Sequence, residues 1–297
     1  MEIKDLISIG LMILMMTLYS FQSFCCKKYA DTYPGRADLA SPVFTVVSGF
    51  TVVLVSLVFM RFRFEASLLT WILGGMNAIA ITGYNYFIVK TSQTGPYTIL
   101  MVFAIAGGII VPTVSALFFA VYPSWLKWLG VCIVIAGVYL ASYRKNDTQA
   151  NYKVFIPCCI ALALFNGAYA ALMDIQQRLT SADEKEEMVA ITYLLAAIAS
   201  LVMLLIKEKG SLRPFRQSPL SLFFVLVTAV LVGLAINLLV IIIPLLNDIT
   251  MLHAVNNCGI LIVSAILSFI FLKEKITRLN LVGYAVMCGA LVLVVFF

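Results

Sequence analysis

Polar side chains recur at helical spacing along the ninth long apolar run of the sequence. At about 100° per residue, five of them fall within an arc of about 60°: Thr250, His253, Asn257, Ser264 and Ser268. Asn256 lies beside this arc, and His253 is the only histidine of the chain. A polar group in a membrane helix is costly unless it faces protein or water. We interpret this face as the lining of a central cavity that binds a small molecule; hydrogen bonding between neighbouring helices is the alternative.

Four other apolar runs carry similar side chains at positions that could face the same cavity. These further candidates for substrate binding are Tyr19 and Gln22 in the first run, Asn77, Tyr84 and Asn85 in the third, Asn166 and Tyr169 in the sixth, and Asn237 in the eighth. Each of them could instead make a structural hydrogen bond between helices. The set therefore offers amide, hydroxyl and imidazole groups without a fixed charge, which favours a neutral or zwitterionic ligand.

Acidic side chains, metal ligands and catalytic motifs are scarce in the apolar runs. Asp174 and Asp248 lie only near the ends of runs, and His253 could titrate near neutral pH but is more simply a neutral, hydrogen-bonded side chain. None of the seven cysteines has the spacing of a zinc site. We find no zinc-protease, serine-hydrolase or nucleotide-binding motif. The sequence predicts no metal, no cofactor and no enzymatic activity.

The composition indicates the elements that must position these side chains. The 297 residues are 63% hydrophobic and 11% charged, whereas soluble domains keep about 25% charged residues. A bilayer core of about 30 Å needs roughly 20 apolar residues in a helix, and backbone groups in lipid must be satisfied within the helix. The sequence predicts an all-α integral membrane protein with ten transmembrane helices, at 5–26, 39–60, 67–90, 95–120, 124–143, 153–178, 187–206, 219–245, 248–272 and 277–297.

The charges are distributed unevenly between the predicted loops. The net charge of +6 forms no basic face or tail, so the sequence does not indicate a nucleic-acid partner. Of the 20 Lys and Arg, 14 lie in the loops after the odd-numbered helices. The positive-inside rule then places those loops in the cytoplasm and both termini outside. The expected location is the cell membrane, with the lipid bilayer as partner and the protein as a monomer or homodimer.

The two halves of the chain repeat one another weakly. A shift of 153 residues superposes Phe118–Leu140 on Phe271–Leu293 with four identical positions, and Asn85 corresponds to Asn237 within one residue. With five helices in each half, the second half must cross the membrane in the opposite sense. The sequence predicts inverted repeats at 1–150 and 151–297 within one membrane unit, an arrangement that many secondary transporters use.

These features resemble the drug/metabolite transporter superfamily, in its EamA-like ten-helix branch. The stretch SAILSFIFLKEKITRLNLVGYAVMCGALVLVV (264–295) is similar to the family's apolar helix, Leu-x-Glu-Lys turn and Gly-containing helix, and 94–119, with Pro112, resembles its first-half counterpart. Glu274 occupies the turn in the second half, but Val121 stands at the matching first-half position. The resemblance implies a cavity between the halves that opens alternately to each side. It also implies cytoplasmic termini, opposite to the charge bias.

We therefore predict a secondary transporter that moves a small neutral or zwitterionic metabolite or drug-like molecule across the plasma membrane by alternating access. Members of the resembling family move amino acids, nucleobases, nucleotide-linked sugars or drugs. A passive channel or facilitator is the alternative, although no ring of charge or carbonyl filter sequence is visible. A membrane-embedded enzyme or a sensor is a further alternative that explains the two polar halves less well.

Overall fold

The structure is a computed structural model that describes residues 3–115, 117, 123–142, 152–179, 184–216, 218–242, 249–274 and 276–296. Within the helices, the side chains at 3–9, 177, 239–242, 249–255, 292 and 294–296 lie outside the described part. The described residues form helices and no strand. The α-helices are α1 (Ile3–Thr32), α2 (Ala37–Phe59), α3 (Leu68–Thr94), α4 (Tyr97–Ser115), α5 (Trp125–Ser142), α6 (Tyr152–Leu179), α7 (Lys185–Lys207), α8 (Pro219–Ile242), α9 (Ile249–Leu267) and α10 (Arg278–Phe296).

The helices follow the predicted apolar runs, and several of their bounds differ by a few residues. The first helix was predicted over 5–26 but continues to Thr32, because Lys27 pairs with Asp31 one turn later instead of ending the helix. The fourth helix is predicted over 95–120; α4 begins at Tyr97 and is described as far as Ser115, with Pro112 inside it, and residues 116 and 118–120 of the predicted run lie outside the described residues.

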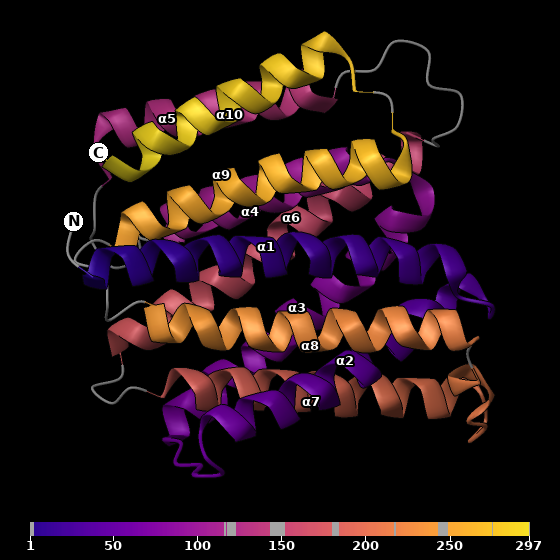
Figure 1. Ribbon diagram of the computed structural model, residues 1–297. Helices are drawn as coiled ribbons and strands as arrows, with labels where there is room; N and C mark the ends of the chain where they lie inside the picture. Colours follow the sequence, from indigo (N-terminus) through magenta and orange to yellow (C-terminus); the bar gives the residue numbers. More distant parts are fainter. Residues whose placement is uncertain are drawn as a thin grey trace.

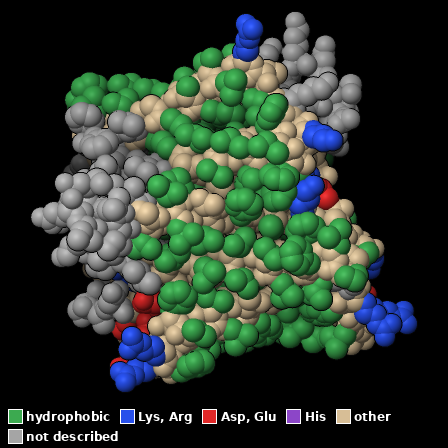
Figure 2. Space-filling model, in the orientation of Figure 1, with side chains coloured by type: hydrophobic (Ala, Val, Ile, Leu, Met, Phe, Trp, Pro, Cys, Tyr) green, Lys and Arg blue, Asp and Glu red, His purple; other side chains and the backbone are tan. Residues whose placement is uncertain are grey.

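Seven of the described helices, α2 to α8, are long and apolar enough to cross a membrane. Two shorter apolar stretches, Asn256–Leu272 and Arg278–Leu291, add to them. Large apolar side chains are exposed along many of the helices. Figure 2 shows them over the middle of one face of the molecule, with Lys and Arg mostly at the margins, where the helices end. A bilayer accommodates such a band, and we conclude that the chain is an all-helical membrane protein with several spans.

The helices lie roughly alongside one another in a bundle (Figure 1). Helices α5 and α10 pack together at one edge, and α2 packs against α7 at the opposite edge. Between these pairs, α1 contacts α8 and α9, while α6 contacts α3 and α4. The N- and C-termini lie at the same end of the bundle (Figure 1). Helices that are distant in sequence thus surround a common interior.

Two of the helix contacts bring backbones so close together that glycine is required. A Cβ at Gly107 of α4 would lie 2.0 Å from the carbonyl oxygen of Ala163 in α6. A Cβ at Gly283 of α10 would lie 2.3 Å from the backbone nitrogen of Ala141 in α5. Small residues at such contacts are typical of membrane helices, where close van der Waals packing drives association. These two contacts fix the spacing of α4 from α6 and of α5 from α10.

Candidate functional site

Four tyrosines converge in the interior of the bundle from four different helices. Tyr19, Tyr84 and Tyr169, from α1, α3 and α6, pack around the apolar cluster that contains Tyr193 of α7. Tyr193 lies within electrostatic range of the other three, and Tyr19 within range of Tyr84 and Tyr169. Tyr193 is 4% exposed, whereas the other three are half-buried. A tyrosine offers an apolar ring and a hydroxyl that both donates and accepts. The cluster therefore combines aromatic surface with hydrogen-bonding groups and carries no charge.

Two asparagines lie on the buried face of α3, the helix that contributes Tyr84 to this cluster. Asn77 is fully buried, and neither its Nδ2 nor its Oδ1 has a hydrogen-bond partner among the described residues. Asn85, at 4% exposure, likewise has no partner for Nδ2 within the described part of the chain. Leaving a buried polar group unpaired costs about 1–3 kcal/mol. A ligand that reached these amides would bond to their unpaired atoms without breaking an existing bond.

The polar arc predicted on α9 is described only in part. Thr250 and His253 belong to the helix, but their side chains lie outside the described residues. Asn256 is buried at 8% exposure, and its Oδ1 has no partner among the described residues. Asn257 is half-buried. The described portion of the arc thus offers one further buried amide oxygen to the interior.

In the C-terminal portion of the arc, Ser264 takes part in a contact between helices, whereas the Ser268 hydroxyl has no hydrogen-bond partner among the described residues. The Tyr97 hydroxyl of α4 lies 3.3 Å from the Ser264 hydroxyl and 3.2 Å from the carbonyl oxygen of Ser20 in α1. This hydroxyl joins three helices at a fully buried point. Ser268 is also fully buried and lies in a turn of π-helix, Ser268–Leu272, that continues α9. For Ser264, the structure provides the bond between helices that was the alternative to a cavity role.

Three other candidates also have structural hydrogen bonds. Asn166 of α6 donates from Nδ2 to the carbonyl oxygen of Ala104 in α4 at 2.8 Å. Asn237 of α8 donates to the Gly233 carbonyl at 2.7 Å and to the Ser56 hydroxyl of α2 at 3.3 Å, which leaves its Oδ1 without a partner in the described part. The Oε1 of Gln22, a buried side chain, accepts from its neighbour Ser23 at 3.4 Å. The structure thus brings Tyr19, Tyr84 and Tyr169 together and engages Asn166 in helix packing.

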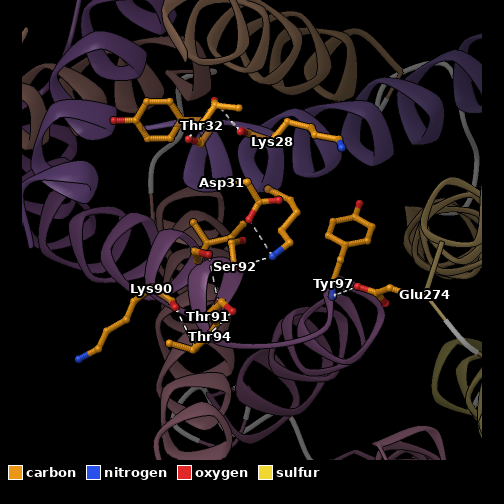
Figure 3. A network of polar contacts seen from close by, with 12 residues as sticks. Lys28, Asp31, Thr32, Lys90, Thr91, Ser92, Thr94, Tyr97 and Glu274 are labelled. Atoms are coloured by element: carbon orange, nitrogen blue, oxygen red, sulfur yellow. Dashed lines mark hydrogen bonds and ion pairs between the residues drawn. The ribbon is translucent and has the colours of Figure 1, made fainter. Parts of the chain in front are cut away.

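A second polar site, which the sequence did not indicate, lies at the end of the bundle where α1 and α3 end. The ammonium group of Lys27 donates to the carbonyl oxygen of Ser92 in the last turns of α3 and lies 3.1 Å from Asp31 Oδ1 (Figure 3). The Lys27 side chain is only 14% exposed. A cation at the C-terminal end of a helix is stabilised by the helix dipole. Sequence spacing relates Lys27 to Asp31, but only the fold brings it to α3.

At the same end, Glu274 caps the N-terminus of α4. Its carboxylate accepts from the backbone N–H of Tyr97 at 2.6 Å and of Thr98 at 3.2 Å, and from the Thr98 hydroxyl at 2.8 Å (Figure 3). The first backbone N–H groups of a helix have no hydrogen-bond partner within the helix. They also form the positive end of the helix dipole, which attracts an anion. The glutamate of the Leu-x-Glu-Lys turn therefore joins the second half of the chain to the first.

A similar contact lies at the N-terminus of α3, where Glu184 binds Ser67. The Glu184 carboxylate accepts from the Ser67 backbone N–H at 2.9 Å and from its hydroxyl at 2.8 Å. Ser67 is itself the N-cap residue of α3. Hydrogen bonds from Thr70 and Ser67 lower the pKa of Glu184, because they stabilise its charged form. Because α4 begins where α3 ends, the Glu184 and Glu274 contacts lie at opposite ends of the bundle.

Among the described residues, no group of His, Cys, Asp and Glu is arranged to hold a metal ion. The seven cysteines are free thiols, and the Cys258 Sγ lies 3.8 Å from the carbonyl oxygen of Cys288. The polar interior described above is therefore a set of hydroxyl and amide groups, suited to hydrogen bonding and stacking.

No protein-family model and no curated protein matches this sequence. Solved structures do match its fold, with 23 chains similar to it. One of them, described as "Crystal structure of protein", is 13% identical in sequence and superposes with a TM-score of 0.65 over 96% of this chain and 95% of that chain. At this identity the likeness concerns the fold alone. The arrangement of helices is therefore one that a solved structure shares along nearly its whole length.

Proposed function

We propose that the protein is a secondary transporter that carries a small neutral or zwitterionic molecule across the plasma membrane by alternating access. The substrate would bind among the four tyrosines and the unpaired amides of α3 and α9. The observation that carries the proposal is Asn77, a fully buried amide with both polar atoms unpaired in the described structure. A structural asparagine would be expected to have found partners, as Asn166 has.

The helix packing supports a construction from two inverted repeats, 1–150 and 151–297, with ten spans. Exchanging each helix of the first half with the helix five places later converts the α1–α8 contact into α6–α3 and the α1–α9 contact into α6–α4. The α2–α8 contact becomes α7–α3, while α2–α7 and α5–α10 are each converted into themselves. All of these contacts are present. Such symmetry suits a carrier, because two halves related by a pseudo-two-fold axis in the membrane plane can exchange their conformations and so open the site to either side.

The carboxylate caps suit such a cycle. Glu274 and Glu184 both belong to the second half, and each binds the N-terminus of a first-half helix, at opposite ends of the bundle. A movement of one half against the other would loosen one contact and leave the other in place. The resemblance to EamA-like drug/metabolite transporters is consistent with this cycle. A passive channel is the second candidate, and a monomer or a homodimer would suit either function.

The decisive experiment replaces Asn77 with leucine, which branches at Cγ as asparagine does but carries no polar atoms and is larger. If Asn77 binds substrate, the gain from removing two unpaired polar groups, about 1–3 kcal/mol, offsets a similar cost of tighter packing, and stability should stay within about 1 kcal/mol of the parent. The substitution should also abolish saturable uptake. The matched control is Asn166→Leu, which breaks the bond to the Ala104 carbonyl and should lower stability by about 1 kcal/mol. The substrate is first sought by thermal stabilisation of the purified protein with a panel of neutral and zwitterionic metabolites.

Transport is then measured in proteoliposomes with the metabolite that stabilises the protein. A carrier saturates and shows counterflow, in which unlabelled substrate inside drives labelled substrate inward. Flux without saturation or counterflow would favour the channel. Loss of stability in Asn77→Leu with unchanged uptake would contradict the assignment of Asn77 to the substrate site. Labelling of an engineered C-terminal cysteine in intact cells, in a protein otherwise free of cysteine, would decide between the orientations implied by the charge bias and by the family.

A further inference from the structure

A groove runs along the outer surface of the bundle between α5 and α6. It consists of two adjoining cavities of about 450 Å³ and about 220 Å³, which share Phe103, Ile135 and Val138. Helix α4 forms its floor, including Gly107, where α4 and α6 come closest. The groove exists because α5 packs against α10 and α4 and leaves a gap in front of α6.

The walls of the groove are apolar and face outward. Ile135 on α5 is 54% exposed, and Ile160 and Leu164 on α6 are 49% and 58% exposed. Helices α4, α5 and α6 are all long and apolar enough to span a membrane. The medium around these walls is therefore the hydrocarbon of the bilayer, and a hollow in that surface is accessible to lipid chains.

The length of the groove along the helices matches the hydrocarbon thickness of one membrane leaflet. Its lining on α6 extends from Tyr152, the first residue of that helix, to Leu164. At 1.5 Å per residue these positions are about 18 Å apart along the helix. Half of a hydrocarbon core of about 30 Å is roughly 15 Å. The groove thus reaches from the end of the spans to about the middle of the membrane, as an acyl chain does.

The polar side chains of the lining gather at one end of the groove. Tyr139 and Ser142 stand in the last turn of α5, and Tyr152 stands at the start of α6. The Ser142 hydroxyl is buried and has no hydrogen-bond partner among the described residues. Lys153, exposed, follows Tyr152 in the first turn of α6. Hydroxyls, a lysine and the positive end of a helix dipole together favour a phosphate group.

We propose that this groove binds a membrane phospholipid, with one acyl chain along α4 between Ile135 and Ile160 and the phosphate near Ser142 and Lys153. The site lies outside the polar core in which we place transport, and it does not depend on that function. An apolar groove of this length with polar side chains at one end fits an amphiphile whose chain lies in the groove and whose head group lies at the polar end. A second copy of the chain would need apolar surface along the full length of the helices and would make no use of the polar end.

The test fills the groove with an aromatic side chain. Full-length protein is purified in a mild detergent, and its melting temperature is measured with and without 1-palmitoyl-2-oleoyl phosphatidylglycerol; bound lipid is counted by native mass spectrometry. At a lipid concentration of about 100 times Kd we expect the melting temperature to rise by about 5 °C or more. Ile135→Trp should abolish the rise and the bound lipid. The matched control is Ile198→Trp on α7, 43% exposed and at the opposite edge of the bundle, which should keep both.

A second variant, Ile160→Trp, fills the groove from its other wall and decides the test if Ile135→Trp does not fold. Retention of the thermal response and of bound lipid in the groove variants would overturn the proposal. Equal stabilisation by dioleoylglycerol, which has the chains but no phosphate, would overturn the contact at the polar end. A parent protein that is dimeric and becomes monomeric in Ile135→Trp, without bound lipid in either, would show that the groove is a subunit interface and would also overturn it.

Discussion

The cap that Glu274 forms on α4 leads to a quantitative prediction for stability. Replacing Glu274 with alanine removes the acceptor of two backbone N–H groups, those of Tyr97 and Thr98, and of the Thr98 hydroxyl. An N-terminal cap contributes about 1 kcal/mol, and hydrogen bonds to a charged group contribute about 1.5–3 kcal/mol. Because Glu274 is half-buried, we expect a loss of about 2 kcal/mol.

The measurement is thermal unfolding of the purified protein. A loss of this size should lower the melting temperature of Glu274→Ala by roughly 4–8 °C. Glu274→Gln keeps one of the two acceptor oxygens and loses the other together with the charge, and we expect about half of that shift. Glu65→Ala is the matched control, because Glu65 is an exposed glutamate in the loop before α3. Its effect should stay within about 0.5 kcal/mol.

A double-mutant cycle with Thr98→Val isolates the bond between the Glu274 carboxylate and the Thr98 hydroxyl, which is 2.8 Å long. For residues in direct contact, the effect of the double substitution should differ from the sum of the single effects by about 0.5–3 kcal/mol. Additivity, or a melting temperature for Glu274→Ala equal to that of Glu65→Ala, would refute the reasoning that this carboxylate holds the N-terminus of α4 to the second half.

Three further changes follow from other contacts. Gly107→Ala should destabilise the protein by about 1–3 kcal/mol in thermal unfolding, because the new Cβ would lie 2.0 Å from the Ala163 carbonyl oxygen; an unchanged melting temperature would contradict the close approach. Because the pKa of Glu184 is lowered in the folded state, its hydrogen bonds stabilise the fold fully at a pH above the pKa of an unfolded glutamate. This stabilisation is lost as the pH falls through the lowered pKa of the folded state. The difference in melting temperature between the parent and Glu184→Gln should therefore shrink on acidification, and a constant difference would speak against it. Asn280→Leu should cost about 1–3 kcal/mol, since Asn280 Nδ2 donates to the Ala141 carbonyl at 2.7 Å and its Oδ1 accepts from the start of α10; retained stability would show that the α5–α10 pair does not depend on it.

Much of the fold could be predicted from the sequence, because its signals are local. A run of about 20 apolar residues must form a helix in lipid, wherever the rest of the chain lies. The predicted runs accordingly correspond to the helices from α1 to α10. The predicted first helix stops at residue 26, where the apolar run ends, whereas α1 continues to Thr32. A lysine with an acidic partner at i+4, as Lys27 has in Asp31, is compatible with a continuing helix.

The candidate site was predictable only as a list of polar side chains within apolar runs. By sequence, Asn77 and Asn166 are equivalent, since each is an asparagine in the middle of such a run. The structure gives Asn166 a bond to the Ala104 carbonyl and leaves Asn77 unpaired among the described residues. Tyr193 was not a candidate at all, because nothing in the spacing of α7 distinguishes it from a tyrosine that packs against lipid.

The sequence by itself determined that the chain forms apolar helices in a membrane, because helix formation in lipid depends on each segment alone. The tertiary structure decided which polar side chains meet. Glu274 binds the start of α4, which lies 176 and 177 positions away in sequence, and four tyrosines from separate helices share one interior. Contacts of this kind depend on which helices pair and on how each helix is rotated about its axis. The close approach of Gly107 to Ala163 is an example, because packing between two helices sets it and residue spacing within one helix does not encode it.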